Sequence, residues 1–91
     1  MAAFVVGVFE GDFDAYKAMF DSDPLGRKQV AKGHTFLRGL DNPSEIFVRI
    51  EFDSAEGAKA FAEKVRASNV LQNMAVKIPP TAVELADQAT Y

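Results

Sequence analysis

The stretch EIFVRIEFDSAEGAKAFAEKV, residues 45–65, decides the fold because it contains a strand and a helix with clear apolar patterns. Residues 45–52 are mostly apolar and include isoleucine, valine and phenylalanine, which is typical of a strand. Asp53 then predicts a helix start, with Glu56 three residues later able to complete a capping box. The helix has one apolar stripe at the spacing i, i+3, i+4 and i+7, formed by Ala58, Phe61, Ala62 and Val65. The stretch therefore predicts a strand followed by an amphipathic helix.

A second strand and helix are predicted near the amino end. The run from Ala3 to Phe9 is apolar on both faces, as expected of a central strand covered on both sides. Asp12 can cap a helix that buries Phe13, Tyr16, Met19 and Phe20. Asp23-Pro24 ends this helix, and Pro24 suits the first turn of a short helix through Val30.

Between these units the sequence predicts a hairpin. Its strands are residues 34–40 and 45–52, joined by the turn Asp41-Asn42-Pro43-Ser44. We expect Leu40 to lie opposite Glu45, because a shift by one residue would pair apolar with charged side chains. This register pairs Leu37 with Val48 and Thr35 with Ile50 on one face, and His34 with Glu51, Phe36 with Arg49 and Arg38 with Phe47 on the other.

The last predicted element is a short strand, residues 81–85. Pro79-Pro80 precedes it, and proline at its start predicts an edge position. The whole order is strand, helix, strand, strand, helix, strand. This order predicts one α+β domain over residues 1–91 with a ferredoxin-like βαββαβ fold, a four-stranded antiparallel sheet and both main helices on one face.

Composition narrows the classes of partner and cofactor. The chain has 91 residues, ten Lys and Arg against thirteen Asp and Glu, no cysteine and one histidine. These numbers argue against disulfides, thiolate metal sites, a protein-only metal cage and binding to nucleic acid or anionic membranes. The amino end is neither basic nor long enough in apolar residues for a signal peptide, so a cytoplasmic location is expected. No cofactor is expected.

The face of the sheet opposite the helices predicts a homodimer. In the expected register it carries Phe36, Phe47 and one side of the first strand, beside His34, Arg38, Arg49 and Glu51. So many apolar groups are rarely left against water in a monomer, and a second copy related by a two-fold axis would cover them. The charged groups would then line a cavity between the two sheets or pair across the interface.

Two sequence segments resemble the antibiotic-biosynthesis-monooxygenase-like group of the dimeric α+β barrel superfamily. They are FVVGVFEGDFDAYKAMFDSD, residues 4–23, and KGHTFLRGLDNPSEIFVRIEFDSAEGAKAFAEK, residues 32–64. The resemblance implies a homodimer whose two sheets form a barrel with a pocket for small, often aromatic molecules. It also implies activities ranging from cofactor-independent oxygenases to haem-degrading enzymes, isomerases and cyclases. The chain lacks tryptophan and has no histidine on a helix, which argues against the haem-degrading branch.

The expected hairpin suggests a candidate catalytic pair, His34 and Glu51. The carboxylate would raise the pKa of the imidazole, whose free nitrogen would accept a proton. Arg38 and Arg49 would hold a developing enolate or phenolate oxygen, with Phe36 and Phe47 beside the ligand. The same charged groups could instead form an ion network at the dimer interface, with Phe36 packed on Arg49 and Phe47 on Arg38.

Two functional classes remain, and a third is argued against. The first is a small cofactor-independent monooxygenase, isomerase or cyclase, and the second is a non-catalytic dimer that binds a hydrophobic molecule or another protein. An RNA-recognition domain has the same topology, but no Lys/Arg-Gly pair precedes Phe47 and the net charge is −3. The sequence leaves the choice between the first two classes open.

Overall fold

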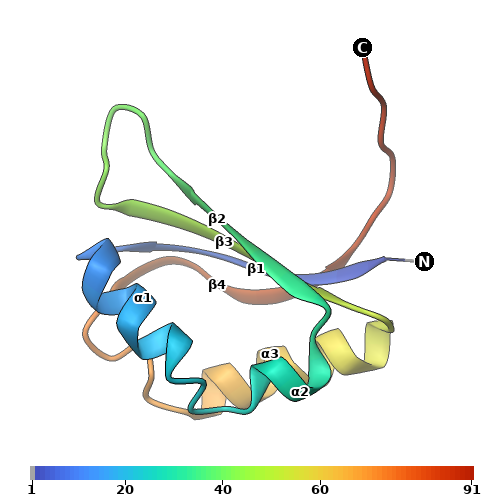
Figure 1. Ribbon diagram of the computed structural model, residues 1–91, viewed down its shortest axis with the longest axis horizontal. Helices are drawn as coiled ribbons and strands as arrows, with labels where there is room; N and C mark the ends of the chain where they lie inside the picture. The colour runs from blue at the N-terminus through green and yellow to red at the C-terminus, as the bar shows by residue number, and fades with distance from the viewer. Residues whose placement is uncertain (1) are drawn as a thin grey trace.

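The protein is a four-stranded sheet with all its helices on one face, as a computed structural model describes for residues 2–91 (Figure 1). The elements in chain order are β1 (Ala3–Glu10), α1 (Phe13–Asp21), α2 (Arg27–Val30), β2 (Gly33–Arg38), β3 (Glu45–Phe52), α3 (Ala55–Ala67) and β4 (Ala75–Glu84). The strands lie in the order β2-β3-β1-β4 and every neighbouring pair is antiparallel. The predicted ferredoxin-like α+β fold is confirmed.

The core lies between the sheet and the helices. Alternate residues of β1 and β3 point into it, and Phe9, Ile46 and Phe52 are its most deeply buried large side chains. The helices contribute the stripes expected from their spacing, namely Tyr16 and Phe20 from α1 and Ala58, Phe61 and Ala62 from α3. Because these groups leave water together, one continuous apolar cluster holds both helices on the sheet.

The sequence predicts the start of one main helix correctly and places the start of the other one residue too early. Asp12 caps α1 as predicted, since its side chain accepts a hydrogen bond from the Asp14 backbone N–H at 3.0 Å. The expected cap of α3 at Asp53 is wrong by one residue. Ser54 is the N-cap, and its hydroxyl oxygen accepts a hydrogen bond from the Gly57 N–H at 3.0 Å.

The last strand is longer than predicted. β4 begins at Ala75 and continues through Pro79 and Pro80, with irregular pairing to β1 between Val6 and Phe9. Proline lacks an N–H donor, but an edge strand needs donors only toward its one neighbour. The predicted edge position is confirmed.

The predicted hairpin register is wrong by one residue. Gly39, rather than Leu40, lies opposite Glu45, and its N–H donates to the Glu45 carbonyl oxygen at 3.0 Å. The loop is therefore one residue longer, and it passes so close to Gly39 that a Cβ atom there would lie 2.6 Å from the Asn42 carbonyl oxygen. The observed pairs are Gly33 with Glu51, His34 with Ile50, Thr35 with Arg49, Phe36 with Val48, Leu37 with Phe47 and Arg38 with Ile46.

The change of register exchanges the two faces of β2. Val48 and Ile50 of β3 face the helices, so their partners Phe36 and His34 lie on that side as well. The ring of Phe36 packs edge-on against Phe13 and Phe20 of α1, at centroid distances of 5.6 and 4.7 Å. Burial of this large ring under α1 is the physical reason for the observed register.

Candidate functional site

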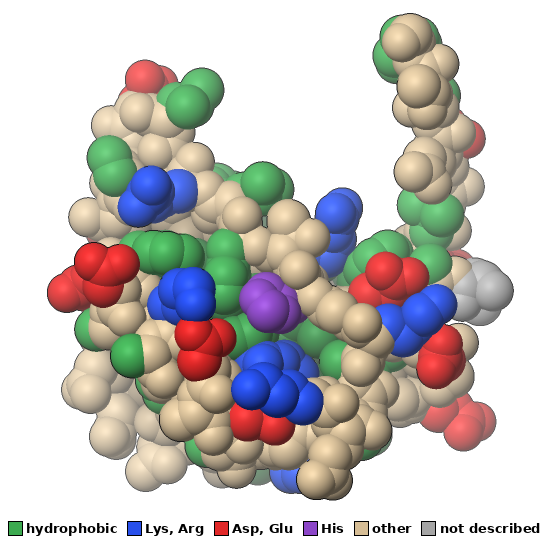
Figure 2. Space-filling model, viewed as in Figure 1, with side chains coloured by type: hydrophobic (Ala, Val, Ile, Leu, Met, Phe, Trp, Pro, Cys, Tyr) green, Lys and Arg blue, Asp and Glu red, His purple; other side chains and the backbone are tan. Residues whose placement is uncertain are grey.

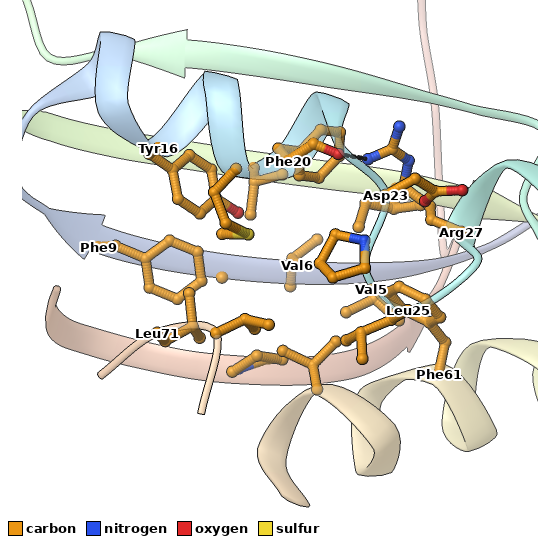
Figure 3. A pocket seen from close by; sticks show the side chains of 18 residues that line it. Val5, Val6, Phe9, Tyr16, Phe20, Asp23, Leu25, Arg27, Phe61 and Leu71 are labelled. Carbon is orange, nitrogen blue, oxygen red and sulfur yellow. Dashed lines mark hydrogen bonds between the residues drawn. The ribbon is translucent and has the colours of Figure 1, made fainter. Parts of the chain in front are cut away.

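A cavity of about 50 Å³ lies between the sheet and the helices (Figure 3). Its walls are almost entirely apolar, and they come from the sheet, from the helices and from the connection between α3 and β4. The lining residues include Val5, Phe9, Val48 and Ile50 of the sheet, Tyr16, Phe20, Phe61 and Val65 of the helices, and Val70 and Leu71 of the connection. Tyr16, Asp23 and Arg27 are the lining residues with polar side chains. Such a site, apolar with a few polar groups, is typical of small-molecule pockets.

Arg27 reaches the cavity because of the turn that precedes it. The second helix does not start at Pro24 as predicted, but at Arg27, after Gly26 in a left-handed conformation with φ 70°. The side chain of Arg27 folds back over α1, with its Cζ atom 3.6 Å from the centroid of the Phe20 ring. Its Nη1 donates a hydrogen bond to the Phe20 carbonyl oxygen at 3.0 Å. Arg27 is thereby only 6% exposed.

Asp23 lies at the same end of the cavity. Its backbone N–H donates to the Phe20 carbonyl oxygen that Arg27 also contacts. Its Oδ2 accepts a hydrogen bond from the Lys28 N–H at 3.2 Å, whereas its Oδ1 is buried without a partner among residues 2–91. Buried carboxylate oxygens almost always have a hydrogen-bond partner, so this vacant acceptor is unusual.

Tyr16 supplies the third polar group. Its ring packs between Phe9 and Phe20, at centroid distances of 5.7 and 5.9 Å. Burial raises the pKa of Tyr16 to about 12, although the positive charge of Arg27 acts in the opposite direction. The phenol is therefore neutral at ordinary pH and can act only as a hydrogen-bonding group.

The structure does not assemble the predicted pair of His34 and Glu51. Residues on opposite faces of a sheet cannot meet, and in the observed register His34 is on the helix side while Glu51 is on the helix-free side. The imidazole packs against the Phe20 ring at 4.8 Å instead. Burial and the positive charge of Arg27 lower the pKa of His34, although Asp21 acts in the opposite direction. The expected rise in this pKa is therefore wrong.

The other predicted site residues are divided in the same way. Arg38 lies on the helix side with Phe36, its Cζ atom 5.3 Å from the Phe13 ring centroid. Phe47 and Arg49 lie on the helix-free side, where the Arg49 Cζ atom is 5.5 Å from the Phe4 ring centroid. The expected packing of Phe36 on Arg49 and of Phe47 on Arg38 is therefore replaced by different cation–π pairs.

The helix-free side is an apolar face bordered by charges. Its exposed large side chains include Leu37, Phe47, Ile78 and Val83, next to the half-buried Phe4, Val6 and Val8 of β1. The tip of the β2–β3 hairpin, with Leu40 fully exposed, and the chain end after β4 rise on either side of it (Figures 1 and 2).

An ion cluster closes one end of this face, and no pattern in the sequence predicts it. The Nζ atom of Lys77 lies 2.7 Å from a carboxylate oxygen of Glu45 and 3.4 Å from one of Glu10. The hydrogen bond from Asn42 and the nearby charge of Lys77 hold the pKa of Glu10 below its usual value, and the contact with Glu45 raises the pKa of Lys77. The cluster ties β4 to β1 and β3 across the sheet.

The described residues contain neither a cluster of metal ligands nor a helix that could span a membrane. Within residues 2–91, no three His, Asp or Glu side chains lie together in a way that could hold a metal ion. No helix in the same range is long and apolar enough to cross a bilayer.

Sequence reasoning missed Asp23 and Arg27, which give the cavity its charge. Asp23-Pro24 was interpreted only as the end of a helix, and Arg27 as part of a short helix. The one local signal is Gly26, whose left-handed conformation turns Arg27 toward Phe20. Nothing in the apolar periodicity predicts that an arginine in a four-residue helix is buried.

Comparisons with known proteins show similarity in structure. No profile of a known protein family matches the chain. No curated protein matches it in sequence. A protein of Chloroflexus aurantiacus J-10-fl, described as a candidate antibiotic biosynthesis monooxygenase, superposes with a TM-score of 0.60 at 13% identity, over 99% of this chain and 98% of that one. The protein Rv0793 of Mycobacterium tuberculosis superposes with a TM-score of 0.56 at 15% identity, over 99% of this chain and 100% of that one. The chain therefore has the fold of the antibiotic biosynthesis monooxygenase-like proteins, as the resemblance of its sequence predicts.

Proposed function

We propose that this protein is a homodimeric barrel protein whose subunits each bind a small, largely apolar or aromatic molecule between the sheet and the helices. The observation that carries the proposal is the cavity lined by Phe9, Tyr16, Phe20 and Phe61, with polar atoms at one end. Four aromatic rings offer a large contact area to a flat apolar ligand. This site replaces the pocket between two sheets as the place where we expect the ligand.

The size of the cavity indicates how a ligand enters. A dry apolar cavity of about 150 Å³ accommodates benzene in another protein, roughly three times the 50 Å³ present here. A ring-sized ligand therefore requires part of the wall to move. Val70 and Leu71 are the best candidates, because they lie in a connection that is neither helix nor strand. Connecting segments are more mobile than helices and strands and often carry binding residues, so we expect this segment to move when the ligand binds.

The test of binding uses toluene as the probe and the methyl signals of the protein in NMR. We expect saturable shifts of the methyl groups of Val5 and Leu71, which line the cavity. Leu71→Trp should fill the space and abolish them, whereas Leu40→Trp, at a fully exposed position, should bind toluene normally. Absence of saturable shifts up to the solubility limit of toluene would contradict the proposal.

The homodimer is supported by the helix-free face. A second copy related by a two-fold axis would cover Phe4, Phe47, Ile78 and Val83. The projecting hairpin and chain end would lie on either side of the sheet of this second copy. We expect Arg49 and Glu51 to lie between the two sheets, where they can pair with each other's copies or border a second space. A stable interface of this kind buries more than about 1,000 Å².

Catalysis by a cofactor-independent monooxygenase, isomerase or cyclase is the second candidate. It is supported by the description of the Chloroflexus protein and by the charged end of the cavity. Within one subunit Arg27 and Asp23 take the roles first assigned to Arg38 and His34. The guanidinium would stabilise an enolate or phenolate oxygen, and the free Oδ1 of Asp23 would accept the proton.

The reaction can be tested with an electron-rich dihydroxyanthrone and dissolved oxygen, without added flavin or metal. In a monooxygenation, one oxygen atom of O₂ replaces the two hydrogens of the ring CH₂ as C=O, and the other leaves as water. We expect oxygen uptake that depends on the protein and is lost in Arg27→Met. Uptake equal to the protein-free rate would favour binding without reaction.

A further inference from the structure

The cavity has one polar end, and its hydrogen-bonding groups are incompletely used. Resting on the proposed binding function, we infer that the ligand carries a hydrogen-bond acceptor next to a hydrogen-bond donor, as in an aryl carboxamide or a hydroxy-carbonyl compound. The acceptor binds the guanidinium of Arg27, and the donor binds the free Oδ1 of Asp23.

The first observation is that the charge of Arg27 has no salt bridge. The residue is 6% exposed, and its side chain makes one hydrogen bond, to the Phe20 carbonyl oxygen, although it has five N–H donors. No carboxylate of residues 2–91 forms a salt bridge with it, although the charge of Asp21 is near enough to interact. The Phe20 ring and carbonyl oxygen are its close contacts, so a ligand oxygen would add a further acceptor.

The second observation is independent and has the opposite hydrogen-bonding character. The Oδ1 of Asp23 is the single buried side-chain oxygen without a hydrogen-bond partner among residues 2–91. The other oxygen of the same carboxylate is held by the Lys28 N–H, which fixes the orientation of the group. Oδ1 therefore requires a donor, and an acceptor such as a ligand carboxylate would be repelled there.

The third observation places both groups together. The Asp23 N–H and the Arg27 Nη1 share the Phe20 carbonyl oxygen, at 3.1 and 3.0 Å, so the backbone of Asp23 and the guanidinium of Arg27 meet at this oxygen. Figure 3 shows both residues at the end of the pocket away from Phe9. Apart from Tyr16, whose ring packs between Phe9 and Phe20, the other lining side chains are apolar. The two polar functions of the ligand therefore have to be adjacent, with an apolar body pointing toward Phe9 and Leu71.

The experiment compares three probes of one shape with the full chain: benzamide, acetophenone and toluene. They offer an acceptor and a donor, an acceptor only, and neither. Affinity is measured by NMR, with the Arg27 Nε–H signal as a direct reporter. We expect benzamide to bind about ten-fold more tightly than toluene, with acetophenone between them.

Two variants separate the polar contacts from the apolar ones. Arg27→Met keeps an apolar stem beside Phe20 but removes the donor, so we expect acetophenone to bind no better than toluene, while benzamide keeps only the contact with Asp23; Lys28→Met, next to it on the surface, is the matched control. Asp23→Asn is compatible with the left-handed backbone at this residue, φ 56°, and can keep the bond from Lys28 N–H to its carbonyl oxygen. Its NH₂ group then replaces Oδ1, so acetophenone should bind more tightly than benzamide.

The outcomes distinguish this inference from the proposed function. Equal affinities for the three probes in the unmodified protein, with shifts at Leu71, would overturn the inference while the proposed apolar pocket remains. No saturable binding of any probe would overturn both. If Arg27→Met fails to fold by circular dichroism, the inversion of preference in Asp23→Asn decides the question, and an unchanged preference there overturns the inference.

Discussion

At the scale of single residues, the chemistry of the helix side is organised around Phe20. Its ring contacts the buried guanidinium of Arg27 and the imidazole of His34, and its carbonyl oxygen accepts hydrogen bonds from Arg27 and Asp23. A positive charge close to an imidazole favours the neutral ring. His34 is therefore an imidazole that resists protonation, rather than one activated by a carboxylate.

The pKa of His34 should lie below its ordinary value of 6.5, because of burial and the charge of Arg27. As the pH falls, the unfolded chain then binds the proton before the folded chain does. The free energy of unfolding should therefore decrease as the pH falls through about 6.5, and His34→Gln should remove this part of the decrease. A proton NMR titration of the single imidazole measures the pKa directly. Glu51→Gln should leave it unchanged, and a value above 6.5 would contradict the observed packing.

At the scale of elements, β2 is the strand whose two faces are hardest to tell apart. Phe36 and Leu37 are adjacent and both apolar, but Phe36 packs under α1 whereas Leu37 is 60% exposed. The longer hairpin loop, with Gly39 against Asn42, allows this arrangement. An aromatic cluster formed with a helix distant in sequence thus determines the register of the hairpin.

Phe36→Ala should lower the free energy of unfolding of the subunit by about 2–3 kcal/mol, because it removes a ring packed against Phe13, Tyr16 and Phe20. Chemical denaturation followed by circular dichroism measures the change. Leu40→Ala is the control, with no measurable change expected at a fully exposed position. If Phe36→Ala had the stability of the unmodified protein, the packing of Phe36 under α1 would be contradicted, and a position on the helix-free face would be favoured.

The elements differ in how well the sequence predicts them, for physical reasons. β3 has the predicted bounds because its residues are mostly β-branched or aromatic, and α3 has the predicted stripe because its spacing matches the period of a helix. β2 lacks such a pattern, so its register depends on tertiary packing. The cavity was not predictable either, since Arg27 is buried by the turn at Gly26 and not by any periodicity.

At the scale of the whole molecule, the two faces of the sheet differ in what their side chains contact. The helix side holds the core and the cavity, and the helix-free side exposes Phe47, Ile78 and Val83 between two projections of the chain. An apolar face of this kind is costly in water. We therefore expect the subunit to associate through this face.

Sedimentation of the purified protein should give a species of twice 9.9 kDa at micromolar concentration. Phe47→Asp should dissociate it, because two carboxylates would be buried near the two-fold axis without partners. Val30→Asp is the matched control, since Val30 is also exposed but lies on the helix side. A stable monomer in the unmodified protein would contradict the homodimer, as would an intact dimer with Phe47→Asp.

The two prolines of β4 also limit how such a molecule can assemble. A foreign strand that adds to the edge of a sheet needs a continuous series of backbone donors and acceptors. Pro79 and Pro80 remove two consecutive N–H groups from the middle of β4, the longer of the two edge strands of the sheet. Growth of fibres by strand addition at this edge is thereby interrupted. We expect association to use the apolar helix-free face of the sheet instead of its edge.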